Sequence, residues 1–198
     1  MNKPTIESLK KAEINEVASF ISAGYFNDIF FKWVVPDDEV RHFIVTEYYK
    51  VYLNAVGAMV HVAKNDDGKI VGTTVWLPHD VDSSIYDDID AATGKYAKNF
   101  RAVADASHDS EPTDTPFYQL VGIVVDPQTQ GQGIGYQLLK AQLDHLDKIG
   151  IPTYLEASTP YVQDKGVYGK FGYKPYKELI YFDENKAVLY PLFREVKT

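Results

Sequence analysis

The sequence predicts a mixed α/β (α+β) fold, in which a mostly antiparallel central sheet is flanked by helices. Two observations carry this prediction. The β-rich runs 59–63 and 70–78 are joined by the sequence Asn-Asp-Asp-Gly at 65–68, which suits a tight antiparallel hairpin with positive φ at its end. Farther on, between residues 117 and 158, two β-rich runs enclose a glycine-rich turn and a helical leucine stripe. This second pattern is typical of a strand–helix–strand unit.

The segment before the hairpin predicts one strand and two helices. Residues 5–9 are expected to form the first strand, and the apolar residues from Ile14 to Tyr25 are spaced for an amphipathic helix. Asp37 or Asp38 is expected to cap a second helix, whose apolar residues continue as far as Val56. Two helices therefore precede the main sheet.

The segment after the hairpin predicts a helix, a strand and a second helix in turn. The first helix is expected around residues 86–106. The nearly all-apolar run 117–125 is expected to be a central strand buried on both faces. A leucine stripe at 138–149 predicts the second helix, which Gly150 and Pro152 end.

The C-terminal part predicts a strand at 153–158, a short helix near 163–171, and a closing hairpin formed by the runs 173–182 and 187–193. Glycine and proline are spread along the chain, and no repeat divides it. A length of 198 residues also suits one domain. We therefore expect a single domain that spans residues 1–198.

Composition argues against several classes of protein. The chain has 28 acidic and 20 basic residues and a net charge of −8, which opposes the binding of duplex nucleic acid. It has no cysteine, so thiol nucleophiles, disulfides and cysteine metal sites are excluded. The five histidines have no metal-ligand spacing, and we expect no metal. No apolar stretch approaches the length of a membrane span, and no apolar signal segment opens the chain, so we expect no membrane partner and a soluble, cytoplasmic protein.

The densest negative charge lies in residues 79–114, where nine acidic residues outnumber three basic ones. Such a charge run is either a solvated helical face or an electrostatic funnel for a cationic substrate. The acidic residues of this segment are Asp80, Asp82, Asp87, Asp88, Asp90, Asp105, Asp109, Glu111 and Asp114.

The most informative stretch is the turn between the run 117–125 and the leucine stripe. It carries three alternating glycines, Gly131, Gly133 and Gly135. Several backbone N–H groups can therefore face one ligand at the positive end of the following helix without obstruction by a Cβ atom. Such a turn suits a phosphate, although a tight strand-to-helix turn with a purely structural role has the same glycine content.

Two common phosphate-binding motifs fit this turn poorly. A dinucleotide-binding Gly-x-Gly-x-x-Gly would begin at Gly131 and Gly133, but position 136 is Tyr, although Glu156 lies near the distance expected for a ribose-binding acid. A P-loop requires Ser or Thr after Gly-Lys, and none of the Gly-Lys pairs is followed by either. A nicotinamide-dependent oxidoreductase is a weak alternative, and nucleotide hydrolysis is disfavoured.

Two segments carry a resemblance to a known family. The spacing Gln130-x-x-Gly133-x-Gly135, after a strand that ends in Val-Asp-Pro, resembles the acetyl-CoA pyrophosphate loop of the GNAT superfamily of N-acetyltransferases. The segment 167–173, Val-Tyr-Gly-Lys-Phe-Gly-Tyr, resembles the Leu-Tyr-x-x-x-Gly-Phe segment with which this family closes the cofactor site. The resemblance implies a GNAT-like fold and acetyl-CoA as cofactor. It places the cofactor on Val124, Val125, Gln130, Gly131, Gln132, Gly133, Ile134 and Gly135.

The chemistry that this resemblance implies is direct attack of an amine on a thioester carbonyl, with loss of the CoA thiolate. The family places a tyrosine that protonates the thiolate where Tyr168 stands, and a phenol with an ordinary pKa near 10 is protonated at neutral pH. The backbone N–H of Val124 or Val125 would stabilise the oxyanion. The absence of cysteine also favours direct transfer over a cysteine acyl-enzyme.

The resemblance also indicates where a general base stands. One branch of the family carries a glutamate on the central strand, but Gln119 occupies that place here and cannot ionise. Another branch, which acts on protein N-termini, has Leu-Glu twelve residues before the tyrosine, and Glu156 fits this spacing. Glu156 is therefore the candidate base; its alternative is an exposed strand residue or a structural ion pair. Tyr161 stands where that branch has an asparagine that helps to hold the cofactor, and His79 is a reserve base.

The resemblance therefore implies an N-acetyltransferase whose acceptor is a small amine, an amino-bearing antibiotic or a peptide amine. The acidic segment motivates the hypothesis that this acceptor is cationic. A set of early aromatic residues either packs in the core or falls where the family forms one wall of the acceptor groove: Tyr25, Phe26, Phe30, Phe31 and Trp33. The alternative function is a non-catalytic module that binds or senses acyl-CoA. Association as a homodimer stays open.

Overall fold

The computed structural model describes residues 3–160, 166–183 and 187–197, and eight strands lie within these ranges. They form a sheet in the order β1-β2-β3-β4-β5-β8-β6, with β7 paired to β8. The pair β4–β5 is parallel and all other described pairs are antiparallel, which confirms the mixed, mostly antiparallel sheet. The strands are β1 (Thr5–Ser8), β2 (Met59–Lys64), β3 (Ile70–Pro78), β4 (Tyr118–Val125), β5 (Thr153–Ala157), β6 (Lys174–Pro175), β7 (Ile180–Asp183) and β8 (Ala187–Arg194).

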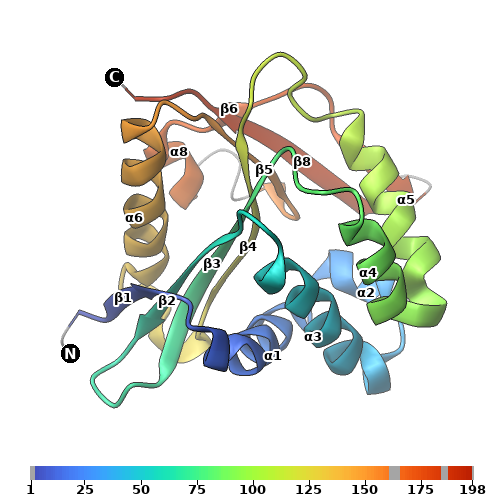
Figure 1. Ribbon diagram of the computed structural model, residues 1–198, viewed down its shortest axis with the longest axis horizontal. Coiled ribbons are helices and arrows are strands. Elements are labelled where there is room, and N and C mark those ends of the chain that lie inside the picture. The colour runs from blue at the N-terminus through green and yellow to red at the C-terminus, as the bar shows by residue number, and fades with distance from the viewer. Residues whose placement is uncertain (1–2, 161–165, 184–186, 198) are drawn as a thin grey trace.

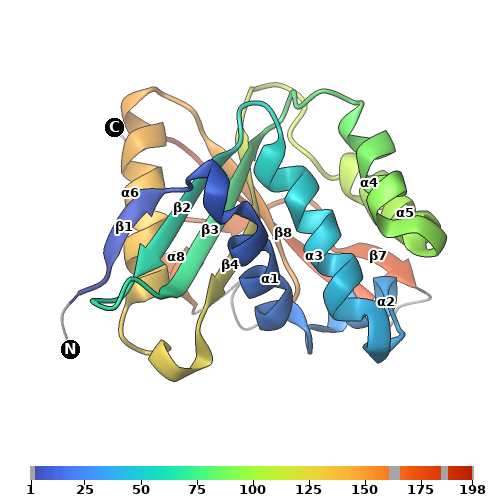
Figure 2. The same ribbon diagram turned by 60° about the horizontal axis from the view of Figure 1, so that its bottom comes forward.

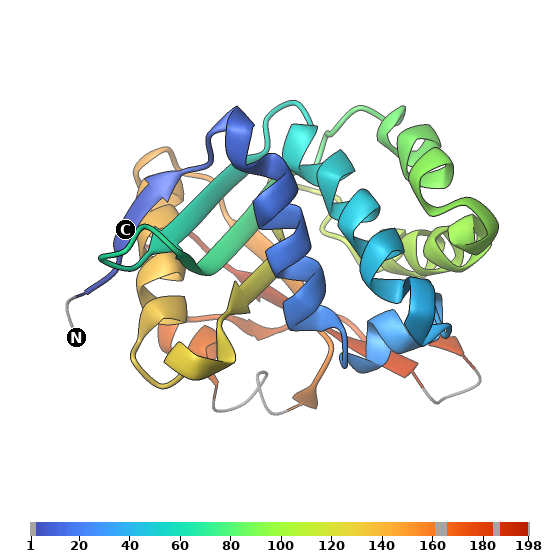
Figure 3. The same ribbon diagram turned by 90° about the horizontal axis from the view of Figure 1, so that it is seen from below.

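Helices cover both faces of the sheet (Figure 1). Figure 2 shows α1, α3 and then α4 and α5 following one another across one face, and Figure 3 shows α1 and α6 on opposite sides of β2 and β3. The strand period separates the two cores: Val75 packs with the α1–α5 side, whereas its neighbour Trp76 packs with α6 and α8. The helices are α1 (Ile14–Tyr25), α2 (Ile29–Val34), α3 (Asp38–Asn54), α4 (Ile85–Thr93), α5 (Ala97–His108), α6 (Ile134–Lys148) and α8 (Val167–Phe171).

Local side-chain contacts explain where several elements begin. Asp37 caps α3, as expected, because its carboxylate accepts a hydrogen bond from the Glu39 N–H at 3.1 Å. In the β2–β3 hairpin, the Asn65 side chain accepts from the N–H groups of Asp67 and Lys69 at 3.1 and 2.9 Å. Gly68 supplies the positive φ, +77°, that ends this turn.

Three expectations for the first half of the chain need correction. A third helix, α2, precedes the sheet because Asp28 caps it, accepting from the Phe30 N–H at 2.8 Å. The helix expected over 86–106 is two helices, since the chain turns at Gly94 with a φ of +55°. Strand β4 is not fully buried: half-buried residues occur on both of its faces, with Val121 at a cavity on the α3 side and Ile123 and Val125 on the α6 side.

The second half of the chain follows the expected order, except that the run expected over 173–182 is two short strands, β6 and β7, which pair separately with β8. Gly150 follows the end of α6, but Ile149 lies just beyond the helix and is 49% exposed, so it does not belong to the buried leucine stripe. The expected helix near 163–171 is described only from Val167 to Phe171, since 161–165 lie outside the described residues. Strand β8 is held by Arg194, whose guanidinium binds Asp147 of α6 through two hydrogen bonds of 2.9 and 2.6 Å.

Candidate active site

The sheet is split between its two parallel central strands. Strands β4 and β5 pair over only three positions, from Tyr118 opposite Thr153 to Leu120 opposite Leu155. Beyond these positions β4 continues to Val125 and β5 to Ala157 without further described pairing. Paired strands stay about 5 Å apart, so the end of pairing opens a gap. Strands β4 and β5 are labelled near the middle of the view in Figure 1.

A bulge in β4 begins where the gap begins. The register between β3 and β4 shifts after Val75, so that β4 carries one extra residue between Leu120 and Gly122. Gly122 then faces α3, where an added Cβ would lie 3.1 Å from the Tyr49 ring. A larger residue would push Tyr49 away from the strand. The glycine therefore permits close packing of α3 against the bulged strand.

Two tyrosine hydroxyls bind the edge of β4 at the gap. The Tyr25 hydroxyl accepts from the Ile123 N–H at 2.8 Å and donates to the Ile123 carbonyl at 3.0 Å. The Tyr49 hydroxyl donates to the Val121 carbonyl at 3.1 Å. Gly24 brings α1 close enough for this contact, since an added Cβ at Gly24 would lie 2.3 Å from a Val124 side-chain carbon. Side chains from α1 and α3 thus satisfy backbone groups that a neighbouring strand satisfies elsewhere.

The glycine loop, residues 130–135, follows β4 and leads into α6. Gly131 and Gly133 have φ of +79° and +80°, and a Cβ at either would meet no described protein atom within 4 Å, so the space before them is open. Gly133 is the N-cap of α6, whose first turn has no acidic residue. The first N–H groups of a helix have no partner within it and attract anions. The loop therefore fits a diphosphate held by backbone groups.

The backbone of β4 also presents a donor to the gap. The Asp126 N–H donates to the Val71 carbonyl on β3 at 3.0 Å. Successive N–H groups along a strand point to opposite sides, so the N–H of Val125 points away from β3 and toward the gap, whereas Val124 pairs with Thr73 of β3. The Gln130 side chain donates to the Val125 carbonyl at 3.3 Å, which ties the loop to the end of the strand.

A cavity of about 180 Å³ lies on the α1–α5 side of the gap. It reaches β4 at Gln119, Leu120 and Val121, and β5 at Glu156. Eight of the described lining residues are aromatic. These rings come from Tyr25, Phe30 and Phe31 near α1 and α2, from Tyr48, Tyr49 and Tyr52 on α3, and from Tyr86 and Phe100 on α4 and α5.

Glu156 places a carboxylate in this cavity. Its Oε2 accepts from the Ser107 hydroxyl of α5 at 2.8 Å, and its Oε1 accepts from the Tyr154 hydroxyl at 2.9 Å. Burial raises the pKa of Glu156 to about 7, although both hydrogen bonds oppose this shift. Burial also raises the pKa of Tyr154 well above its usual range, so its hydroxyl stays protonated and donates. A carboxyl group with a pKa near 7 is suited to proton transfer at neutral pH.

Tyr168 lies on the opposite side of β5 from Glu156. It is buried with Leu155, Ala157 and Phe171 on the α6 and α8 side. Burial raises its pKa well above the usual range, and nearby Tyr25 adds to this effect. No described residue hydrogen-bonds its hydroxyl. The phenol of Tyr168 and the carboxyl group of Glu156 thus lie on opposite sides of β5.

The other residues singled out in the sequence are dispersed. Gln119 lines the cavity, but His79 is absent from its described lining and contacts Phe117 and Asp80. Among the early aromatics Tyr25, Phe30 and Phe31 line it, whereas Phe26 lies beneath Arg41 and Trp33 packs on Phe182. Tyr161 lies outside the described residues.

The acidic segment contributes less to the cavity than its charge suggests. Asp87 and Asp90 bind Arg101, and Asp88 borders a separate, shallow hollow between α3 and α4. From this segment only Glu111 lies among the described acidic residues of the cavity wall, together with Asp28 and Glu156 from other elements.

Several functional candidates escaped the sequence analysis. Ser107 and Glu111 come close to Glu156 only through tertiary packing, so their separation along the chain carries no signal. Tyr154 is different, because it stands two residues before Glu156 on the same face of β5. Tyr48 and Tyr52 are four residues apart on α3, which places them on one helix face. That spacing was visible but is equally typical of a core-facing stripe.

The described residues hold no cluster of three or more His, Asp or Glu side chains suited to a metal ion. Among the described helices, none has the length and apolar character needed to cross a bilayer.

Comparison with family models identifies the fold. Residues 24–173 match the model of the acetyltransferase (GNAT) family, and this stretch contains the glycine loop, the gap and both sides of the cavity. The chain belongs to the GNAT acetyltransferase family. Members of this family are enzymes that use acyl-CoA, and the chain is accordingly a GNAT N-acetyltransferase.

Solved structures agree with this assignment. The histone acetyltransferase HPA2 and related acetyltransferase of Corynebacterium glutamicum has a TM-score of 0.71 at 18% identity, covering 100% of this chain and 98% of that one. Arylalkylamine N-acetyltransferase 2 of Aedes aegypti has a TM-score of 0.66 at 14% identity, and the match covers 99% of this chain and 100% of that one. Polyamine N-acetyltransferase of Drosophila melanogaster has a TM-score of 0.62 at 14% identity, and the match covers 96% of this chain and 98% of that one. These likenesses show a common fold. No curated protein matched the chain.

Proposed function

We propose that this GNAT enzyme transfers an acetyl group directly from acetyl-CoA to a small primary amine, with Glu156 as general base and Tyr168 as general acid. One observation supports the proposal: Glu156 lines the cavity on one side of β5, whereas Tyr168 packs with Leu155 and Ala157 on the other side. Amine and thioester can therefore approach from two sides and meet in the gap. Fixing both reactants in this way supplies much of the rate enhancement of such a transfer.

The residues at the end of β4 fit acetyl-CoA. Gln130, Gly131, Gln132, Gly133, Ile134 and Gly135 would hold the diphosphate through backbone N–H groups, and Val124 and Val125 would border the pantetheine arm. Bound there, acetyl-CoA supplies an activated acyl carbonyl and a thiolate leaving group. Of the two valines, Val125 has the N–H directed to the gap and is our candidate donor to the carbonyl oxygen.

Two proton transfers remain for side chains. Ionised Glu156 accepts one proton from the attacking nitrogen, and Ser107 and Tyr154 hold the carboxylate in place for this step. Tyr168 keeps its proton at neutral pH, because its pKa lies well above the usual range, and it gives that proton to the departing sulfur. The proton donor and the proton acceptor are thus different residues on different faces.

The cavity favours a small amine over a peptide. Its volume of about 180 Å³ lies below the range of about 300–1,000 Å³ that is common for drug-sized ligands. The names of two structural neighbours point the same way, since they describe acetyltransferases of arylalkylamines and of polyamines. We further propose that residues 1–198 act as one N-acetyltransferase domain, since one sheet extends from β1 to β8.

Thiol release measured with acetyl-CoA and a panel of small amines tests this function, with mass spectrometry to identify the acetylated amine. We expect release that depends on the amine, and a fall in kcat of about 10- to 100-fold in Tyr168→Phe. Tyr173→Phe is the matched control, since Tyr173 packs against the Tyr168 ring but its hydroxyl faces Thr153. Binding of acetyl-CoA without release for any amine would instead indicate a sensing module.

A further inference from the structure

Three carboxyl groups line the described wall of the cavity, and they differ in how far other protein groups bind them. Asp28 is fully engaged: one carboxylate oxygen caps α2 through the Phe30 N–H at 2.8 Å, and the other accepts from the Ser158 hydroxyl at 2.8 Å. Glu156 accepts two hydrogen bonds from hydroxyl groups, but no described basic residue binds it. Glu111 is the third carboxylate of the described wall.

Glu111 is held in the loop after α5. The Lys177 ammonium donates to the carbonyls of Asp109 and Glu111 at 3.2 and 2.7 Å, which fixes the loop. The charges of Lys177 and His79 also act on the Glu111 carboxyl group and oppose the rise of its pKa. The contact of that carboxylate in the described chain is His108, at 3.6 Å, and the His108 side chain is 80% exposed. Burial raises the pKa of Glu111, and the charge of Glu111 contributes to the raised pKa of Glu156. Two carboxylates therefore repel each other across the cavity.

The cavity wall offers these two carboxylates no free cation. Arg101 is the basic residue of its described lining, but its guanidinium forms hydrogen bonds of 2.8–3.0 Å with both oxygens of Asp90 and a further bond with Asp87. Arg101 also lies over the Tyr86 ring, 5.1 Å from its centroid. It is thus directed to α4 and to the outer part of the cavity. Glu156 therefore has no described basic partner, and a cation that compensates it would come from the ligand.

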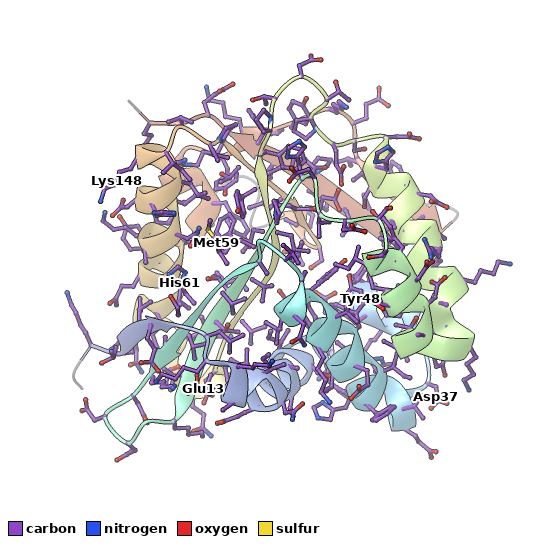
Figure 4. The ribbon with its side chains drawn as sticks, viewed as in Figure 1. Glu13, Asp37, Tyr48, Met59, His61 and Lys148 are labelled. Carbon is purple, nitrogen blue, oxygen red and sulfur yellow. The ribbon has the colours of Figure 1, made fainter. Side chains whose placement is uncertain are left out.

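Beside the two carboxylates the wall is aromatic. Tyr48 points from α3 toward α4 and α5 (Figure 4), where its ring centroid lies 4.7 Å from Phe100 and 4.7 Å from Tyr52. The Tyr48 hydroxyl donates to that of Tyr52 at 2.7 Å, so their polar ends are largely satisfied by each other. Flat rings with paired hydroxyls favour an aromatic or apolar ligand body over a hydrated one.

We propose that the acceptor is a primary amine with a single positive charge and an aromatic body, whose ammonium binds between Glu111 and Glu156 while its ring packs against Tyr48, Tyr52 and Phe100. This inference rests on the proposed function and names the substrate class of that same site. Glu111 is then a specificity-determining residue: it recruits the charged amine beside the base. The bound ammonium releases one proton to solvent before attack, and Glu156 accepts the second proton as the amide forms. A diamine is disfavoured, because its second ammonium would lose its hydration against the aromatic part of the wall.

A first experiment compares acceptors with the wild-type enzyme. Thiol release is measured with acetyl-CoA and phenethylamine, hexylamine, putrescine or a short peptide with a free N-terminus. We expect the highest kcat/KM for phenethylamine, with putrescine and the peptide lower by about tenfold or more. A preference for putrescine or the peptide would overturn the assignment of the substrate class. Release with none of these amines or any other would remove the proposed function itself.

A second experiment tests the role of Glu111. Glu111→Gln keeps the shape of the side chain and removes its charge; we expect KM for phenethylamine to rise about tenfold while kcat above about pH 8 changes less than threefold. Asp88→Asn is the matched control, because it removes one charge from the same acidic segment outside this cavity. Equal KM in wild type and Glu111→Gln would overturn the role, and so would an equal rise in Asp88→Asn.

The pH profile separates this role from a structural one. The titratable groups that face Glu156 are Tyr154 from β5, Tyr52 from α3 and Glu111 from the loop after α5, and both tyrosines keep raised pKa values. Removing the charge of Glu111 leaves burial as the main cause of the Glu156 shift, so the acid limb of kcat moves to lower pH. A loosened loop would lower kcat without moving that limb. An unmoved limb would overturn the proposed proximity of the two carboxylates.

Discussion

The glycine loop and the acceptor cavity serve the same gap, but they are built from different parts of the chain. The loop is contiguous, carries no charged side chain, and relies on backbone N–H groups and two left-handed glycines. The cavity is assembled from side chains of α1 to α5, β4 and β5, and its chemistry depends on buried carboxylates. A backbone site tolerates change in neighbouring side chains, whereas a side-chain site changes specificity with one substitution. We therefore expect cofactor binding to tolerate side-chain substitutions that change the acceptor specificity.

The largest expected effect comes from a substitution that removes the proposed base in the cavity and leaves the glycine loop unchanged. Glu156→Gln removes the proposed base, and we expect kcat to fall about 10²- to 10³-fold while KM for acetyl-CoA stays unchanged. The pH dependence has a defined sign. The pKa of Glu156 is raised to about 7, so wild-type activity increases as pH rises through this value and the carboxyl ionises. The residual activity of the variant is expected to lack this limb.

Steady-state kinetics at several pH values measure both parts of this prediction. Glu47→Gln is a suitable control, since Glu47 belongs to the hollow between α3 and α4 and not to the described wall of the cavity. If Glu156→Gln keeps the wild-type limb, another group is the base. A large change in KM for acetyl-CoA would show that the two halves of the site are not independent.

A smaller effect is expected from a substitution in the glycine loop that leaves the cavity unchanged. Gly133 caps α6 with a φ of +80°, a conformation that costs an alanine about 1 kcal/mol or more. The substitution Gly133→Ala turns the first N–H groups of α6, and we expect KM for acetyl-CoA to rise about tenfold with little change in KM for the amine. Gly150→Ala is the matched control, because Gly150 has a φ of +72° and open space at the other end of the same helix.

Titration calorimetry with CoA and thermal unfolding separate binding from stability here. Both alanine variants are expected to lose similar stability, and only Gly133→Ala is expected to lose affinity. Equal affinity for CoA in the two variants would place the diphosphate elsewhere.

The same difference explains what the sequence could predict. The spacing Gln130-x-x-Gly133-x-Gly135 is local, so its chemistry is readable in the chain, and the strand–helix–strand order around it was predicted correctly. Glu156 was reached through its spacing to Tyr168, but Ser107 and Glu111 were not, because the break at Gly94 and the packing of α5 bring them there. The gap was equally hidden. It depends on the β4 bulge and on Tyr25 and Tyr49, which only tertiary structure brings to β4.

The smallest expected effect concerns the place where the two halves meet. Tyr25 belongs to the cavity wall, yet its hydroxyl binds the N–H and carbonyl of Ile123 on the strand that leads to the loop. Tyr25→Phe leaves both backbone groups without this partner, and we expect a loss of about 1 kcal/mol, which lowers Tm by about 2–4 °C in a protein of this size. Tyr181→Phe, at an exposed tyrosine, is the control in the same thermal unfolding experiment. If Tyr25→Phe unfolds like wild type, solvent or β5 satisfies Ile123, and the gap does not depend on side chains. If it loses stability as expected, a side chain of the acceptor cavity also holds in place the strand that leads to the glycine loop. Substitutions that change the acceptor specificity are then expected to lower stability at Tyr25 but not at Glu111.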